Sequence, residues 1–145
     1  MAQEIKKRPR VGVGVMVLKD GKVLLGHRHP DPEMARSALH GEGTWTMPGG
    51  SLEFQEELED AACREVKEET GMDIDKSKLR VISIGNEIVP DNHFVTIGYL
   101  YENPDGEPEV MEPDQITEWE WFSLDKLPSP IFPPSEKLIA AYRKK

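Results

Sequence analysis

The chain has 145 residues, enough for one domain with a buried core. Its hydrophobic fraction of 37% and charged fraction of 31% are ordinary for a globular protein, and its formal net charge is -9. This acidic balance argues against nucleic acid as the main partner, because binding duplex nucleic acid draws on a basic patch. The one cysteine, Cys63, cannot form an internal disulfide, and no apolar run approaches the roughly 20 residues that cross a membrane. We therefore expect a cytoplasmic protein with no membrane partner.

The first half of the chain predicts a short tail, a β-hairpin and then a loop. The charged residues 1–10 are untypical of a signal peptide and predict a flexible tail before one domain at residues 11–145. Val11–Leu18 is almost wholly apolar, which is typical of a buried strand. Asp20-Gly21 favours a hairpin turn, from which the chain returns as a strand over Val23–Gly26. The prolines, glycines and mixed charges of His29–Gly43 indicate a loop with room for one helical turn, and Trp45–Met47 predicts a short strand.

The strongest helix prediction covers Glu56–Thr70. Good helix formers fill this stretch, and Gly71 stands where a left-handed C-terminal cap is favoured. Leu58, Ala62 and Val66 recur every four residues and give the helix an apolar stripe. We expect this stripe to pack against a sheet.

The second half of the chain predicts three further strands and a closing helix. Leu79–Val89 and His93–Tyr101 are rich in β-forming residues and are separated by the turn residues Pro90-Asp91-Asn92. Trp119–Phe122 predicts a short strand and Ser135–Arg143 a helix. Strands mixed with two helices indicate an α/β or α+β domain with a mixed sheet.

Three acids of the predicted helix would lie on one face. At 100° per residue, Glu65, Glu68 and Glu69 fall within about 100° of arc. Their mutual repulsion is relieved if a divalent cation lies among them, and hard carboxylate oxygens suit Mg²⁺ or Mn²⁺. On charge alone, the alternative is an acidic helix face that is simply solvated.

The spacing around these acids favours the metal site. Nine specified positions over 23 residues have a fixed separation: Gly50, five residues, Glu56, seven residues, Arg64-Glu65-Val66, one residue, Glu68-Glu69, one residue, Gly71-Met72. This pattern resembles the Nudix box with every position filled. The resemblance implies the Nudix fold, an α/β/α sandwich with a mixed β-sheet and a catalytic loop-helix-loop. It also implies an enzyme that attacks a diphosphate linkage with water.

The resemblance implies a role for each box residue. Glu65, Glu68, Glu69 and the backbone of Gly49 match the family's ligands for Mg²⁺, which Mn²⁺ can replace. Arg64 matches an arginine that holds the box carboxylates in position. Gly49 and Gly50 would let the backbone turn sharply beside the metal and the substrate.

The general base stays open at this stage. Glu65 or Glu68 could serve, but several relatives use a glutamate outside the box. The matching position here is Gln115, which cannot accept a proton. Glu112, Asp114 and Glu118 lie nearby in the sequence.

Outside the box, the chain resembles MutT-like hydrolases of nucleoside triphosphates. His93-Phe94-Val95-Thr96 carries part of this likeness, and we expect Thr96, Gly49 and Gly50 to contact substrate. Arg28 matches an arginine near the phosphates, although a surface strand arginine is an equal alternative. The resemblance implies cleavage of a triphosphate, including oxidised purine nucleotides, to the monophosphate and pyrophosphate. The alternatives are hydrolysis of ADP-ribose or another nucleoside diphosphate derivative, or a silent nucleotide-binding domain. Relatives are often homodimers, and the loop His29–Gly43 is longer than theirs.

Overall fold

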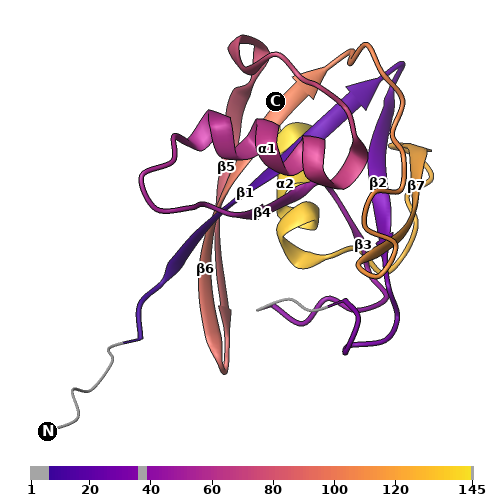
Figure 1. Ribbon diagram of the computed structural model, residues 1–145. Helices are drawn as coiled ribbons and strands as arrows, with labels where there is room; N and C mark the ends of the chain where they lie inside the picture. The colour runs from indigo at the N-terminus through magenta and orange to yellow at the C-terminus, as the bar shows by residue number, and fades with distance from the viewer. Residues whose placement is uncertain (1–6, 36–38, 145) are drawn as a thin grey trace, which may run out of the picture.

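In the computed structural model, which describes residues 7–35 and 39–144, seven strands form one sheet. Its main path runs β3-β2-β1-β6-β5, while β4 pairs with β1 and β7 pairs with β2. The β1–β6 pair is parallel and the others are antiparallel, so the sheet is mixed as predicted (Figure 1). The strands are β1 Arg10–Lys19, β2 Lys22–Arg28, β3 Trp45–Thr46, β4 Gly49–Ser51, β5 Arg80–Val89, β6 Asn92–Glu102 and β7 Ile116–Ser123.

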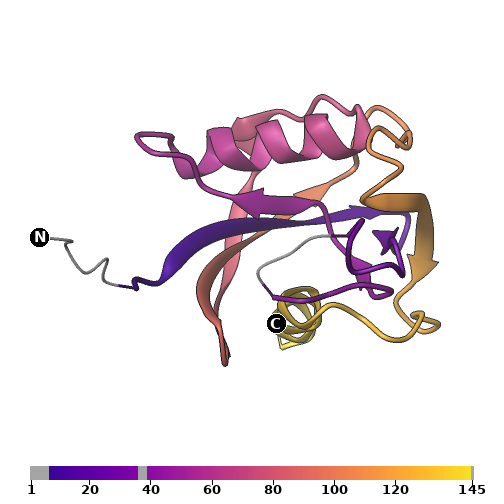
Figure 2. The same cartoon turned by 60° about the horizontal axis from the view of Figure 1, so that its bottom comes forward.

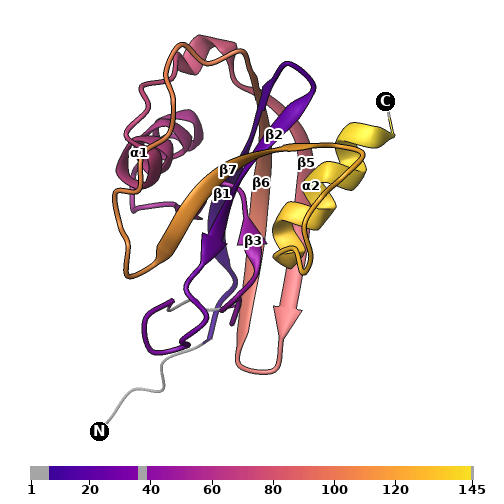
Figure 3. The same ribbon diagram turned by 90° about the vertical axis from the view of Figure 1, so that its right-hand side faces the viewer.

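Two helices lie on opposite faces of this sheet. Helix α1 (Leu58–Thr70) covers one face and α2 (Pro133–Arg143) the other, as Figures 2 and 3 show from two sides. A short 3-10 helix, η1 (Lys76–Lys78), follows α1. The predicted α/β/α sandwich is therefore confirmed. None of the described helices has the length and apolar character needed to cross a membrane.

Strand β1 lies at the centre of the fold, and its sequence explains why. Val13, Val15 and Val17 pack into the cluster under α1, whereas Met16 and Leu18 pack into the cluster under α2. A strand covered on both faces needs an unbroken apolar run. Each of these fully buried side chains contributes about 1.5–3 kcal/mol. The strand begins at Arg10, within the predicted tail, whose residues 1–6 lie outside the described residues.

Helix α1 ends where the sequence predicts and begins two residues later. Gly71 adopts the left-handed conformation (φ 78°), and its N–H donates to the carbonyl of Lys67. At the start, Gln55 has a positive φ of 66° and Glu57 is extended. Glu56 remains in the loop, where its carboxylate accepts a hydrogen bond from the Glu53 N–H. The first two residues of the predicted helix, Glu56 and Glu57, therefore lie before it.

Three other boundaries differ from the sequence prediction. Gly49 and Gly50, expected to form a sharp turn, lie with Ser51 in β4, which pairs with β1 through Gly12↔Ser51 and Val13↔Gly50. The helix η1 was not predicted. Helix α2 begins at Pro133, two residues early, because proline is favoured in a first helical turn. The remaining strands lie within three residues of their predicted bounds.

Candidate active site

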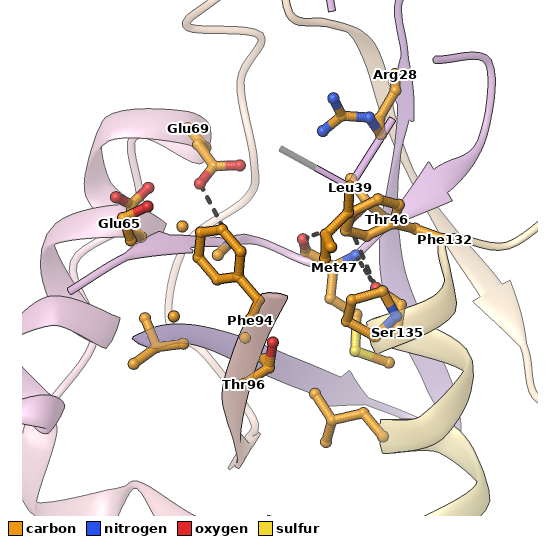
Figure 4. Close-up of a pocket in the computed structure, with 18 of the residues that line it drawn as sticks. Arg28, Leu39, Thr46, Met47, Glu65, Glu69, Phe94, Thr96, Phe132 and Ser135 are labelled. Carbon is orange, nitrogen blue, oxygen red and sulfur yellow. Dashed lines mark hydrogen bonds between the residues drawn. The ribbon is translucent and has the colours of Figure 1, made fainter. Parts of the chain in front are cut away.

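A cavity of about 460 Å³ lies between the β1–β6 floor, the β4–α1 corner and the start of α2. Figure 4 shows Glu65 and Glu69 at one end, and Leu39, Met47, Phe132 and Ser135 at the other. The four predicted substrate contacts all line this cavity: Arg28, Gly49, Gly50 and Thr96. Sequence segments far apart thus meet at one place.

Gly49 and Gly50 are needed because other groups approach their backbone closely. Both lie in the extended strand β4 rather than in a sharp turn, which corrects the prediction made for them. A Cβ at Gly49 would lie 2.3 Å from the Val13 carbonyl oxygen. A Cβ at Gly50 would lie 2.5 Å from the carboxylate of Glu65. The missing side chains let α1 bring its carboxylate against the strand.

Glu65 and Glu69 form a coupled carboxylate pair at this corner. Glu69 is only 8% exposed, and its Oε2 accepts a hydrogen bond of 3.1 Å from the Gly49 N–H. Burial raises the pKa of Glu69 well above its ordinary value, and a hydrogen bond with Glu65 and the Glu65 charge raise it further. Burial also raises the pKa of Glu65. Two carboxylates this close hold a shared proton unless a cation takes its place.

The donor set fits a hard divalent cation. The Glu65 and Glu69 carboxylates provide oxygen ligands, and the two glycines beside them leave the space that Mg²⁺ or Mn²⁺ needs. Glu68, the third predicted ligand, is 49% exposed at its side chain and contacts Arg64 at 3.4 Å. Among the described residues, no three acidic, histidine or cysteine side chains converge on one point. The third carboxylate is therefore not pre-assembled with the other two.

Arg64 makes hydrogen bonds to the carboxylates that we expected it to position. Its Nε and Nη2 donate to both oxygens of Glu56 at 2.8 and 2.9 Å, and Nη2 also donates to the Ser51 carbonyl. Its Nη1 donates to Glu65 at 2.9 Å. The hydrogen bonds from Arg64 lower the pKa of Glu56 to about 2. Arg64 does not line the cavity, so it acts through the acids it orients.

The structure separates the three acids considered as a base outside the box. Glu112 lines the cavity, whereas Asp114 and Glu118 do not. Burial raises the pKa of Glu112, and the charges of Glu65 and Glu68 raise it further. Gln115 also lines the cavity, where its amide donates to the Met34 carbonyl at 2.8 Å. Of these three acids, Glu112 is thus the one that lines the cavity.

Arg28 is neither a surface residue nor a free cation. Its Nε donates to the Gly41 carbonyl at 2.9 Å and its Nη2 to the Ala35 carbonyl at 3.0 Å. The guanidinium carbon lies 5.2 Å from the centre of the Phe132 ring. Burial lowers the pKa of Arg28, and the charges of Glu69 and Glu42 oppose that shift. The surface alternative is therefore wrong for this residue.

Sequence reasoning missed much of the end of the cavity away from the carboxylates. Leu39, Met47 and Leu138 line it. Met47 and Leu138 also belong to the core cluster under α2. Their local sequence carries no signal beyond ordinary core packing, so only the tertiary structure shows their second role.

With this geometry in place, comparison with known proteins identifies the family. A family model described as NUDIX domain matches residues 8–142. The chain belongs to the NUDIX family. The box residues found at the carboxylate corner are those expected of a Nudix hydrolase, and relatives named as pyrophosphatases agree with an enzyme of this family.

Two relatives and one structure indicate how close the likeness is. The chain is 32% identical over 134 residues to an ADP-ribose pyrophosphatase of Methanocaldococcus jannaschii, covering 92% of this chain and 73% of that protein. It is 30% identical over 141 residues to the NAD-capped RNA hydrolase NudC of Pseudomonas putida, covering 96% of this chain but only 45% of NudC. A MutT NUDIX hydrolase from Burkholderia pseudomallei superposes with a TM-score of 0.82 at 33% identity, covering 93% of this chain and 98% of that one.

Proposed function

We propose that this Nudix hydrolase cleaves a phosphoanhydride bond in a nucleoside triphosphate and releases the monophosphate and pyrophosphate, with Mg²⁺ as cofactor and Mn²⁺ as a substitute. The observation that carries this proposal is the two-ended cavity. Its acidic end holds the Glu65–Glu69 pair, and its opposite end is lined by Leu39, Phe132 and other apolar side chains.

The two ends suit the two parts of a nucleotide. Phosphate oxygens bridged by a divalent cation fit the carboxylate end. A flat nucleobase fits the apolar end, where the Phe132 ring and a few hydroxyls provide apolar surface and orientation. Thr46, Thr96 and Ser135 bring those hydroxyls to the cavity wall.

The chain's own residues support attack by water on phosphorus. A bound divalent cation would neutralise charge that develops on the phosphate oxygens. Glu112 faces the same space, and its raised pKa suits a group that accepts a proton from the attacking water. Arg64 donates a hydrogen bond of 2.9 Å to Glu65 and so keeps that carboxylate in position. Gln115, whose amide is a hydrogen-bond donor to the loop, takes no part in proton transfer.

A second candidate is a nucleoside diphosphate derivative such as ADP-ribose. The likeness to the archaeal ADP-ribose pyrophosphatase favours it, because that protein is 32% identical over most of this chain. Both substrates would place a diphosphate at the same carboxylates. They differ in the group beyond the diphosphate, so the products distinguish them.

The test is a product analysis of the purified protein with Mg²⁺. The panel contains nucleoside triphosphates, 8-oxo-purine triphosphates, ADP-ribose and dinucleoside polyphosphates. Monophosphate and pyrophosphate from a triphosphate, abolished by a chelator, are the expected result. Turnover of ADP-ribose alone would favour the second candidate. Tight nucleotide binding without turnover of any substrate would indicate a silent binding domain and contradict the proposal.

A further inference from the structure

Leu39, in the loop between β2 and β3, forms one wall of the cavity, and a single arginine ties together the described parts of that loop, residues 29–35 and 39–44. Arg28 is the last residue of β2. It donates hydrogen bonds to two carbonyls on opposite sides of the loop, at Ala35 (3.0 Å) and at Gly41 (2.9 Å). Ala35 is 1% exposed, and Leu39, between the two anchor points, lines the cavity. The position of this wall therefore depends on where the guanidinium lies.

Gly41, Arg28 and Phe132 also pack against one another. The guanidinium lies over the Phe132 ring, and a Cβ on Gly41 would lie 2.3 Å from Cε1 of that ring. The same Cβ would lie 3.0 Å from Nε of Arg28. The backbone of Phe132 is fixed by its own hydrogen bond, because its N–H donates to the Trp45 carbonyl at 2.8 Å. The loop backbone, the cation and the ring thus form a packed stack with no space for another side chain.

A second tie reaches the same wall from Gln115, the residue before β7. Gln115 donates its side-chain amide to the Met34 carbonyl, and its own carbonyl accepts from the His29 N–H at 2.8 Å. Two side chains that line the cavity, Arg28 and Gln115, therefore donate hydrogen bonds to three backbone carbonyls of the loop, at residues 34, 35 and 41. Two of the five N–H donors of Arg28 are thus used on carbonyls of the loop.

We propose that Arg28 is a positioning residue that sets substrate selectivity, because it places the wall that meets the group carried by the phosphates. The inference rests on the proposed function for its substrates, but the placement of the wall can be tested without any substrate. It differs from the role suggested by the sequence, in which Arg28 contacts the phosphates. Geometry rather than charge is what matters here. A lysine at this position keeps the charge but cannot reach two carbonyls with a planar fork.

The kinetic test compares two triphosphates that differ only in their base, dGTP and dCTP. The variants are Arg28→Lys, Arg28→Ala and Gly41→Ala, and the matched control is Lys22→Ala at the other end of β2. Lys22 is exposed and does not line the large cavity. We expect the ratio of kcat/KM for the two nucleotides to change about ten-fold or more in the three variants, mainly through KM. We expect the control to keep the wild-type ratio.

A phosphate contact would give a different pattern. Both nucleotides would lose kcat/KM by the same factor in Arg28→Ala, and Arg28→Lys would recover part of the loss because it keeps the charge. Uniform loss with rescue by lysine would overturn the inference.

Hydrogen exchange provides the readout that does not depend on activity. The N–H groups of Gly43 and Thr44 donate within the loop region at 3.2 and 3.1 Å, so their exchange reports its stability. We expect exchange about ten-fold faster in Arg28→Lys than in wild type or Lys22→Ala, with circular dichroism confirming an unchanged fold. Wild-type exchange in Arg28→Lys would overturn the inference. If the wild-type protein hydrolyses neither nucleotide, the proposed function fails while this measurement still decides the role of Arg28.

Discussion

Adding one methyl group at Gly50 should disable catalysis while leaving the fold intact. The new Cβ would lie 2.5 Å from the Glu65 carboxylate, whereas ordinary contacts begin at 3.4 Å. Glu65 must therefore withdraw by roughly 1 Å, and a displacement of that size in an active site costs about 100-fold in rate. The carboxylate is the end of a side chain, so it can move at a cost to stability of about 1–3 kcal/mol.

The assay for Gly50→Ala combines turnover, metal affinity and thermal unfolding. We expect kcat at saturating Mg²⁺ to fall about 100-fold and Mn²⁺ binding to weaken. Gly106→Ala is the matched control, because its Cβ would meet only Met72 Cγ at an ordinary 3.7 Å. Gly49→Ala provides the opposite contrast: its Cβ would lie 2.3 Å from a backbone oxygen of β1, so it should lose stability first. Wild-type kcat and metal affinity in Gly50→Ala would refute the reasoning.

Three further predictions concern the acidic end. Glu69→Gln should lose most activity with little change in Tm, because it removes a ligand charge but almost no volume; wild-type turnover at saturating Mg²⁺ would contradict the ligand assignment. Glu112→Gln should lower kcat by about 10²–10⁴-fold without weakening Mn²⁺ binding. Steady-state kinetics and metal titration measure the two effects. An unchanged kcat would mean that the general base is a glutamate of the box. Without metal, the folded protein holds the Glu69 proton more tightly than the unfolded chain does. The free energy of unfolding should therefore fall as pH rises above the ordinary Glu pKa of 4.5, and saturating Mg²⁺ should oppose this fall. Urea titrations with and without chelator would show it, and a flat profile in chelator would contradict the buried, proton-sharing pair.

What the sequence predicted well is what local residues determine. The cap at Gly71 and the apolar stripe of α1 follow from spacing within one helix. The Arg64–Glu56 pair does not, because it forms only with Glu56 in the loop before α1. Strand β4 was missed because two glycines have no strand preference of their own, and only pairing with β1 makes them extended. The contacts of Arg28 were missed for a similar reason. Its partners are backbone carbonyls, which leave no signature in the side-chain sequence.

The two ends of the cavity are built from different parts of the sequence. Gly49 to Glu69, one continuous stretch, supplies the β4–α1 corner with its carboxylate pair. The opposite end is assembled from two other parts of the chain: Arg28, Leu39, Thr46 and Met47 in one, and Phe132, Ser135 and Leu138 in the other. A substitution in either part can change what the cavity accepts without touching the carboxylate pair of the β4–α1 corner or Glu112. Substrate preference can therefore drift by single steps while the reaction is inherited unchanged, and relatives with one chemistry can come to act on different molecules.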